Sequence, residues 1–562
     1  MKKTPSVERL DPAAGGGAEK APLLQALEAE LERSLEELPK KTDPPPYFIA
    51  YEAVETDETT IRASGGALLT SDSSRSRTLD VEVRVGNRSL DSTHPQRGGN
   101  PFETLVALLG GVPIALPLED DEAAIRAAAW HLTDQRYKKA VEALGKVKAQ
   151  VAVRTAEEDK SPDLSEEPAE TYLGAPARLA FNRAALEKRV EVWSEPFRAH
   201  AEVLESEANL RTFVETRYFV NSEGTVVQAG STRVLVYLTA STRADDGMDL
   251  QVYRVVYAET PDALPSDDAI RAKAEEAVKD LLALRAAPIA EPFTGPAILK
   301  GQAAGVFFHE VFGHRVEGHR QRKEEEGQTF AKKIGEKVMP AFVSVYDDPT
   351  LRTLNGTVLA GSYTFDDEGV RSQRATLVKD GVMKGFLMAR KPARGFDKSN
   401  GHGRRHPGYT VVARQGNLVV EPSRSVTYAR LKEMLIEEVK RQGQPYGLLF
   451  DDLQGGFTFT ERAFPQAFKV LPIVVYRVRP DGREELVRGA DIVGTPLSAL
   501  SDIVAAADDY QTFNGVCGAE SGGVPVSATS PSLLVRKIEI ERKEKGSEKP
   551  PLLPPPETGQ GR

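Results

Sequence analysis

Residues 47–86, YFIAYEAVETDETTIRASGGALLTSDSSRSRTLDVEVRVG, are rich in β-branched and aromatic side chains and are interrupted by glycine and aspartate. This composition predicts several antiparallel strands. The preceding stretch, LLQALEAELERSLEEL at 23–38, places apolar residues three and four positions apart, which predicts an amphipathic helix. A helix followed by such a meander indicates an α+β fold. We therefore expect an N-terminal helix-plus-antiparallel-sheet module at 23–105.

A central α+β region is predicted at 106–285. The stretch at 120–153 predicts a long helix whose first turn is acidic, as the helix dipole favours. RAALEKRVEVWSEPFRAHAEVL at 183–204 and DDAIRAKAEEAVKDLLALRAA at 267–287 predict two further helices. Strand-like segments, including LRTFVETRYFVNSEGTVVQ at 210–228, lie between them.

A third, strand-rich region is predicted at 286–545, because three prolines in RAAPIAEPFTGPAIL indicate a boundary and few long helices follow. The chain of 562 residues is too long for a single core, so this division into several regions is expected. Residues 1–22 are rich in glycine, alanine and proline, and residues 546–562 are rich in proline. Both tails are predicted to be disordered.

Charge and composition exclude several classes of protein. The net charge of −10 disfavours a direct nucleic-acid binder, which would normally carry a basic stripe. A single cysteine allows no intramolecular disulfide. No stretch approaches eighteen apolar residues, so no membrane span is predicted. The two lysines after Met1 precede no apolar segment, so secretion is not supported and a cytoplasmic protein is expected.

The stretch HEVFGHRVEGH at 309–319 contains three of the eight histidines. On a helix, residues four apart differ by about 40° in direction, which is why H-E-x-x-H can hold one metal ion. His309 and His314 are five apart and would differ by roughly 140°, so a regular helix cannot direct both at one ion. A π-type bulge would return them to one face, and Gly313 would ease that distortion.

Other ligand sets are open from the residues alone. Glu310 and His314 are four apart and need no distortion, and His319 offers a further imidazole. The three histidines could also lie on a polar helix face without any metal. Zinc in a hydrolase usually has three protein ligands. Cys517, in a glycine-rich segment, could complete a His-His-Cys set suited to zinc, although a lone cysteine is more often an inert buried side chain.

The C-terminal region resembles the TldD/PmbA metalloprotease family, once called modulators of DNA gyrase. Its H-E-x-x-x-H signature is met by His309, Glu310 and His314, with Gly313 before the second histidine. Further matching segments, in chain order, are Asp366-Asp367-Glu368-Gly369, TLVKDGVMKGFL at 376–387, GHGRR at 401–405, VRGADIVGTPLSALSDI at 487–503 and VCGAESGGVPVSATSPSLLV at 516–535.

This resemblance implies a zinc-dependent peptidase with His309, His314 and Cys517 as metal ligands and Glu310 as general base. Zinc would lower the pKa of a bound water, and Glu310 would take its proton. The resemblance also implies small or unfolded peptides as substrates and a dimer, either with a second copy or with a metal-free relative. The chain departs from the family at His319, where an acidic residue is common, and after the double arginine.

Three rival functions stay open. One is a modulator of DNA gyrase that touches DNA, although the net charge of −10 weighs against direct DNA contact. Cys517 could be the nucleophile of a cysteine peptidase with His309 or His314 as its base. The chain could instead be a catalytically silent partner that binds peptides and regulates a related protease. Asp366, Asp367 and Glu368 are interpreted as a local turn, and Arg404 and Arg405 as solvated arginines.

Overall fold

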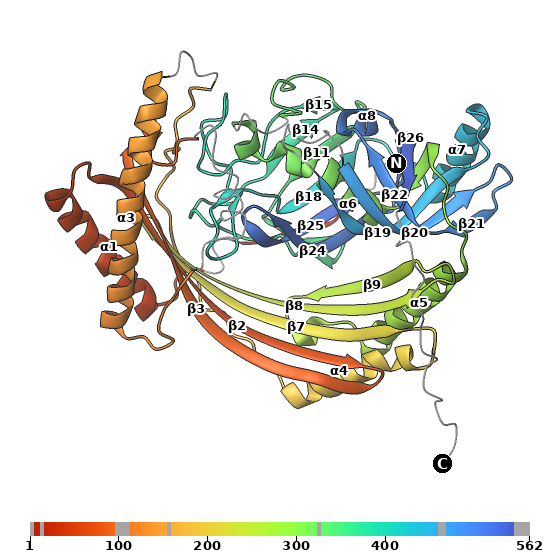
Figure 1. Ribbon diagram of the computed structural model, residues 1–562, viewed down its shortest axis with the longest axis horizontal. Coiled ribbons are helices and arrows are strands. Elements are labelled where there is room, and N and C mark those ends of the chain that lie inside the picture. The colour runs from red at the N-terminus through yellow and green to blue at the C-terminus, as the bar shows by residue number, and fades with distance from the viewer. Residues whose placement is uncertain are drawn as a thin grey trace.

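The computed structural model describes residues 5–11, 16–95, 113–153, 159–322, 328–458 and 468–543. A curved sheet of long strands lies beneath a strand-rich C-terminal domain, with helices on its outer side (Figure 1). This mixture confirms the predicted α+β fold class. The predicted tail at 546–562 lies outside the described residues. Within the described ranges, every helix is too short or too polar to cross a bilayer.

One long hairpin replaces the several strands predicted at 47–86. β2 (Pro46–Ser64) and β3 (Ala67–Asn87) pair along almost their whole length, and the turn between them is Gly65-Gly66. Both glycines have positive φ values, +56° and +82°, a conformation that other residues rarely adopt. The aspartates that we interpreted as breaks lie inside the strands; Asp57, for example, pairs with Arg75.

The curved sheet contains eight strands and joins the two regions that the sequence divided at residue 105. β7 (Glu205–Asn221) pairs with β2 from Ala50–Asn221 to Ala63–Ala208, so both regions share one sheet. The remaining strands are β4 (Leu90–Asp91), β5 (Ile114–Ala115), β6 (Thr171–Leu173), β8 (Val226–Arg243) and β9 (Asp249–Ala258).

Helices cover the outer face of this sheet in two groups (Figure 1). Alternation along β2 directs Ile49, Tyr51 and Ala53 into a core with α1 and α3, and Ile61 and Ala63 into a core with α4 and α5. The opposite face of β2 meets the C-terminal domain. The helices are α1 (Pro22–Lys41), α3 (Glu122–Val153), α4 (Arg183–Arg198) and α5 (Asp267–Ala286), which match the predicted ones.

Two sheets build the C-terminal domain. In the first, β10 pairs with both β19 and β26, which closes five strands into a ring. Its strands are β10 (Phe293–Leu299), β19 (Gly447–Thr458), β20 (Phe468–Val478), β21 (Glu484–Val487), β22 (Ala490–Gly494), β23 (Ile503–Ala506) and β26 (Leu533–Arg542). The second is β15 (Val382–Met383), β14 (Ala375–Lys379), β11 (Val343–Asp347), β18 (Asn417–Pro422), β25 (Gly522–Ser530) and β24 (Gln511–Ala519), in that order.

Smaller elements complete the domain, and one of them corrects a prediction. β1 (Val7–Arg9) lies in the N-terminal tail predicted to be disordered, yet it pairs with β12 (Leu351–Leu354). The Arg9 guanidinium donates to the buried carboxylate of Asp348 at 2.9 Å, which holds this strand in place. The other elements are β13 (Thr357–Val358), β16 (Gly403–Arg404), β17 (Val412–Ala413), α6 (Gly301–Val311), α7 (Tyr428–Arg441) and α8 (Pro496–Ser501).

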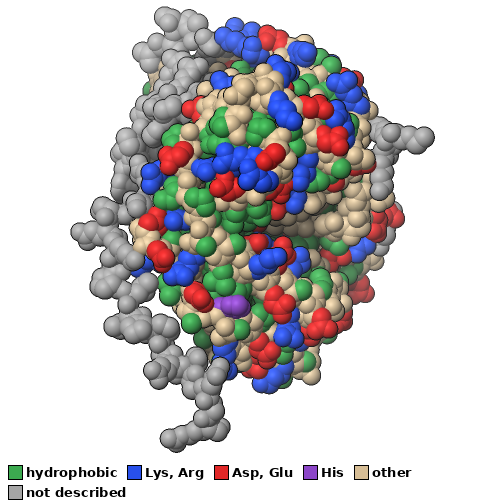
Figure 2. Space-filling model, turned by 90° about the vertical axis from the view of Figure 1, so that its right-hand side faces the viewer, with side chains coloured by type: hydrophobic (Ala, Val, Ile, Leu, Met, Phe, Trp, Pro, Cys, Tyr) green, Lys and Arg blue, Asp and Glu red, His purple; other side chains and the backbone are tan. Residues whose placement is uncertain are grey.

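The surface of one side is hollowed between the C-terminal domain, in the upper part of Figure 2, and the curved sheet with its helices in the lower part. Acidic and basic side chains are intermingled over this face. Among the described residues on this face, no concentrated basic stripe of the kind that nucleic-acid binders use is seen.

Candidate metal centre

Helix α6 is buried along its whole length between the two sheets of the C-terminal domain. Apart from the half-buried Gln302 in the first turn, its residues are apolar and buried up to His309, which lies in the last turn. Gly305 allows α6 to lie close to β25, because a Cβ atom at residue 305 would lie 2.6 Å from the carbonyl oxygen of Ala528 in that strand. The helix can therefore approach β25 closely enough to bring His309 beside that sheet.

The two histidines meet because α6 ends between them. The helix ends at Val311, and a 3₁₀ turn follows at Gly313–Val316, so this turn, and not the π-type bulge considered above, brings the two rings together. The imidazole rings of His309 and His314 lie 4.9 Å apart, inclined by 79°. Gly313 is required for close packing, since a Cβ there would lie 1.9 Å from the Gln415 side-chain oxygen.

Cys517 completes the cluster from β24, the edge strand of the second sheet. Its sulfur lies 3.1 Å from Nε2 of His309 and 3.4 Å from Nε2 of His314. All three side chains are buried, and their potential ligand atoms lie within 4.8 Å of one another. In the described part of the chain, this is the one group of three or more such side chains that could hold a metal ion.

The donor set fits zinc. Zinc–nitrogen and zinc–sulfur bonds of about 2.0–2.3 Å in a tetrahedral site separate nitrogen from sulfur by roughly 3.6 Å. The observed separations, 3.1 and 3.4 Å, are close to that value. A thiolate with two imidazoles is also the soft-to-borderline combination that zinc accepts.

The electrostatics of the cluster favour a thiolate. Burial raises the pKa of Cys517, but His314 and His309 beside it lower the pKa by more. The pKa therefore lies well below its ordinary value. Burial lowers the pKa of His314, while Cys517 and Glu317 raise it well above its ordinary value. The thiolate is the form of cysteine that binds metals, so the side chain is prepared to act as a ligand.

Glu310 lies next to the three candidate ligands. Its Oε2 atom is 4.0 Å from Nε2 of His314, and the side chain is largely buried. It is not one of the three groups whose ligand atoms all lie close together. This position leaves its carboxylate available to accept a proton beside the metal site.

His319 occupies a different place. Its Nε2 atom lies 2.6 Å from Oε1 of Glu520, in the turn between β24 and β25. The structure thus brings Cys517, and not His319, to the histidine pair.

Two neighbours of the centre were missed from the sequence. Glu317 lies 3.1 Å from Nδ1 of His314, and Arg414 donates to the carbonyl oxygen of Cys517 at 2.7 Å. Burial raises the pKa of Glu317, but His314 and Arg320 lower it by more, so that the pKa is about 2. Its spacing three residues after His314 was a usable signal, whereas nothing in the sequence near Arg414 indicated its contact.

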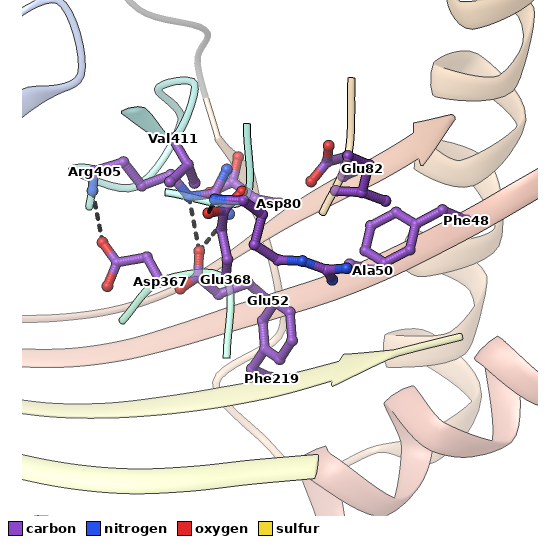
Figure 3. A pocket seen from close by; sticks show the side chains of 12 residues that line it. Phe48, Ala50, Glu52, Asp80, Glu82, Phe219, Asp367, Glu368, Arg405 and Val411 are labelled. Atoms are coloured by element: carbon purple, nitrogen blue, oxygen red, sulfur yellow. Dashed lines mark hydrogen bonds and ion pairs between the residues drawn. The ribbon is translucent and has the colours of Figure 1, made fainter. Parts of the chain in front are cut away.

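The predicted turn at Asp366 is confirmed, since its carboxylate accepts from the backbone N–H groups of Glu368 and Val370. The same segment also fastens the C-terminal domain to the curved sheet. In Figure 3, Arg405 lies between Asp367 and Glu52, a residue of β2. Arg405 is therefore not the solvated arginine that the sequence had suggested.

Arg404 is buried and donates to the carbonyl oxygens of Gln415 and Pro525 at 2.8 and 2.6 Å. Its guanidinium thus connects the segment between β17 and β18 to β25, so Arg404 is not a solvated arginine either.

Comparisons with known proteins identify the family of the C-terminal domain. Residues 293–542 match the family model described as the PmbA/TldA metallopeptidase C-terminal domain. The chain is 31% identical over 275 residues to a metalloprotease TldD homolog of Haemophilus influenzae, covering 48% of this chain and 52% of that one. Its C-terminal domain belongs to the TldD/PmbA family.

A second curated relative matches a similar share of the chain. A zinc metalloprotease TldD homolog of Saccharolobus solfataricus is 25% identical over 252 residues, covering 44% of this chain and 51% of that protein. The chain therefore spans about half the length of these two curated relatives.

Solved structures share the fold of this family member. TldE of Thermococcus kodakarensis superposes with a TM-score of 0.59 at 14% identity, covering 92% of this chain and all of that one. A Thermotoga maritima protein described as a candidate modulator of a DNA gyrase gives a TM-score of 0.59 at 18% identity, with 92% and 100% coverage.

Proposed function

We propose that this chain is a zinc-dependent peptidase that hydrolyses small or unfolded peptides. The observation that carries the proposal is the convergence of His309, His314 and Cys517, with Glu310 4.0 Å from His314. The names of the family relatives, which include a zinc metalloprotease, support the same reading.

In this function His309, His314 and Cys517 hold the ion. Bound zinc supplies a Lewis acid that polarises the scissile carbonyl group and acidifies water. Glu310 accepts a proton from the attacking water and delivers it to the leaving amine. Burial of Glu310 among the candidate ligands keeps this carboxylate beside the reacting atoms.

The strand that carries Cys517 supports the proposed substrate class. β24 is an edge strand, so one side of its backbone is not paired within its sheet. Val516 is 55% exposed, and the position of Gly518 is open, on either side of the buried Cys517. An extended peptide can add to such an edge by backbone hydrogen bonds, which favours unfolded segments over folded proteins.

A cysteine peptidase is the second candidate, because the Cys517 thiolate lies 3.1 Å from Nε2 of His309. A chelator separates the two functions. Removal of zinc abolishes the activity of a zinc peptidase, whereas a peptidase that uses a cysteine–histidine pair stays active.

Elemental analysis of zinc in the wild type and in Cys517→Ala is the decisive experiment. About one zinc per wild-type chain and far less in Cys517→Ala, together with chelator-sensitive cleavage of an unstructured peptide, is the expected result. Wild-type protein that cleaves peptides equally well without zinc would favour the cysteine mechanism. Zinc-loaded protein without any cleavage would favour a silent peptide-binding partner.

A further inference from the structure

The side of His314 that faces away from Cys517 is occupied by a buried carboxylate. Nε2 of His314 lies 3.4 Å from the Cys517 sulfur, while Nδ1 lies 3.1 Å from Oε1 of Glu317. Glu317 is fully buried, and its second oxygen accepts from Nε of Arg320 at 2.8 Å. A carboxylate in this place fixes both the tautomer and the orientation of a ligating imidazole.

A buried arginine connects this carboxylate to the strand that carries the cysteine. Nη2 of Arg414 donates to the carbonyl oxygen of Cys517 at 2.7 Å, and Nη1 donates to Oγ of Ser521 at 2.7 Å and to the Gly522 carbonyl oxygen at 3.0 Å. Its Nε lies 3.6 Å from Oε1 of Glu317. One planar guanidinium thus contacts β24, the turn after it, β25 and the carboxylate behind His314.

A second link reinforces the same connection. Nη2 of Arg320 donates to Glu520 in the β24–β25 turn at 2.8 Å, while its Nε donates to Glu317. The segment that contains His314 and the hairpin that contains Cys517 are therefore joined through two arginines. Both arginines meet at Glu317.

We propose that Glu317 and Arg414 are positioning residues of the metal centre, an inference that rests on the proposed zinc-peptidase function. Glu317 fixes the direction in which the His314 ring presents Nε2. Arg414 fixes where the Cys517 backbone lies relative to Glu317, and so sets the distance between two of the three ligands. Neither residue touches the metal position or the reacting atoms.

The test measures metal binding by the full-length, metal-free protein. Zinc affinity is determined by competition with a chromophoric chelator, and Co²⁺ is added separately to record the thiolate-to-cobalt charge-transfer band per bound ion. The variants are Glu317→Gln, which removes the charge and keeps the shape, and Arg414→Lys, which keeps the charge and loses the planar fork. Arg390→Lys is the matched control, because Arg390 is equally buried but donates to Ser165 and Glu223, away from the centre.

Loss of such a partner typically weakens metal affinity by about 10- to 100-fold, and this loss is expected in Glu317→Gln and Arg414→Lys. The charge-transfer band per bound cobalt should also weaken in Arg414→Lys, because Cys517 shifts. A merely structural role would lower stability and leave that band unchanged. Circular dichroism verifies folding, and Glu317→Gln decides the matter if Arg414→Lys does not fold.

The remaining outcomes separate the inference from the function on which it rests. Wild-type protein that binds no zinc refutes the proposed function and with it the inference. Wild-type protein that binds zinc, with both variants retaining its affinity and its cobalt band, overturns the inference alone. Equal losses in Arg390→Lys also overturn it, because they indicate general loosening of the fold.

Discussion

The sulfur of Cys517 lies 3.1 Å from Nε2 of His309, although 208 residues separate the two in the chain. The contact depends on the order of strands in the second sheet. β24 carries Cys517 and pairs with β25, which in turn packs against α6 and pairs with β18. The centre is thus a product of the whole C-terminal domain and not of the H-E-x-x-x-H segment alone.

Glu310→Gln should keep zinc and lose turnover. The amide has nearly the same size but cannot accept the proton from water, so kcat should fall by about 10²- to 10⁴-fold. Zinc content and peptide cleavage are measured on the same sample. Glu437→Gln, on the exposed face of α7, is the control and should retain full activity. Undiminished cleavage by Glu310→Gln would refute its assignment as the base.

Zinc should stabilise the folded chain. A ligand that binds only the native state at 100 times its Kd adds about 2.7 kcal/mol to the free energy of unfolding. Thermal unfolding of the metal-free protein should therefore shift upward when zinc is added. Cys517→Ala should show a much smaller shift, and an equal shift in both proteins would place the ion elsewhere.

Gly313→Ala should destabilise the protein by about 1–3 kcal/mol, the usual cost of inserting a methyl group into a packed interior. The added Cβ would lie 1.9 Å from the Gln415 side-chain oxygen. Gly145→Ala is the opposite control, because its position in α3 is open and alanine favours helix by about 0.5–1 kcal/mol. Urea denaturation measures both, and an unchanged stability in Gly313→Ala would show that Gln415 can move aside.

Glu368 should make stability depend on pH. Burial and the nearby Glu82 raise the pKa of Glu368 from 4.5 to about 7, although Arg390 beside it acts in the opposite direction. The folded state then binds more protons than the unfolded state between these values, so stability falls as pH rises from about 4.5 to about 7.

Glu368→Gln should weaken this dependence, because the amide does not titrate. Its side-chain oxygen can still accept from the Arg390 backbone N–H group. The variant should be more stable than wild type at pH 8, by at most about 3 kcal/mol at 1.36 kcal/mol per pKa unit, and nearly equal at pH 4.5. Urea denaturation at the two pH values provides the comparison. Wild type and variant with parallel pH profiles would assign the dependence to other groups, such as Asp366.

Helices with a clear apolar stripe could be predicted from the sequence. The spacing of Leu23, Leu27 and Leu31 locates α1 well, because those residues pack against the sheet as the pattern requires. The sheet was harder to predict. Asp57 and Glu58 resemble strand ends. Cross-strand partners keep these charged residues inside a long hairpin: Arg75 lies opposite Asp57, and Arg211 of β7 forms an ion pair with Glu58. Such partners are contributed by distant segments and leave no local signal.

The site, too, could be predicted only in part from the sequence. The histidine pair could be located from composition, but its geometry depends on where α6 ends, and Gly313 is compatible with a bulge as well as with a 3₁₀ turn. The glycine-rich segment around Cys517 left it open whether this residue is a ligand or an inert thiol, and the family resemblance favoured the ligand. Arg414 carries no sequence signal because its role arises from contacts to Cys517 and Glu317, about 100 residues away in either direction.

The long sequence interval between His309 and Cys517 also determines when the candidate ligands can come together during translation. At about 5–20 residues per second, a ribosome adds the intervening 208 residues in roughly 10–40 s. During that time the nascent chain carries both histidines and Glu310 but lacks the thiolate and the strand that holds it. A growing chain therefore cannot bring the three candidate ligands together, and the proposed peptidase activity can arise only after the C-terminal domain has been translated as far as β24.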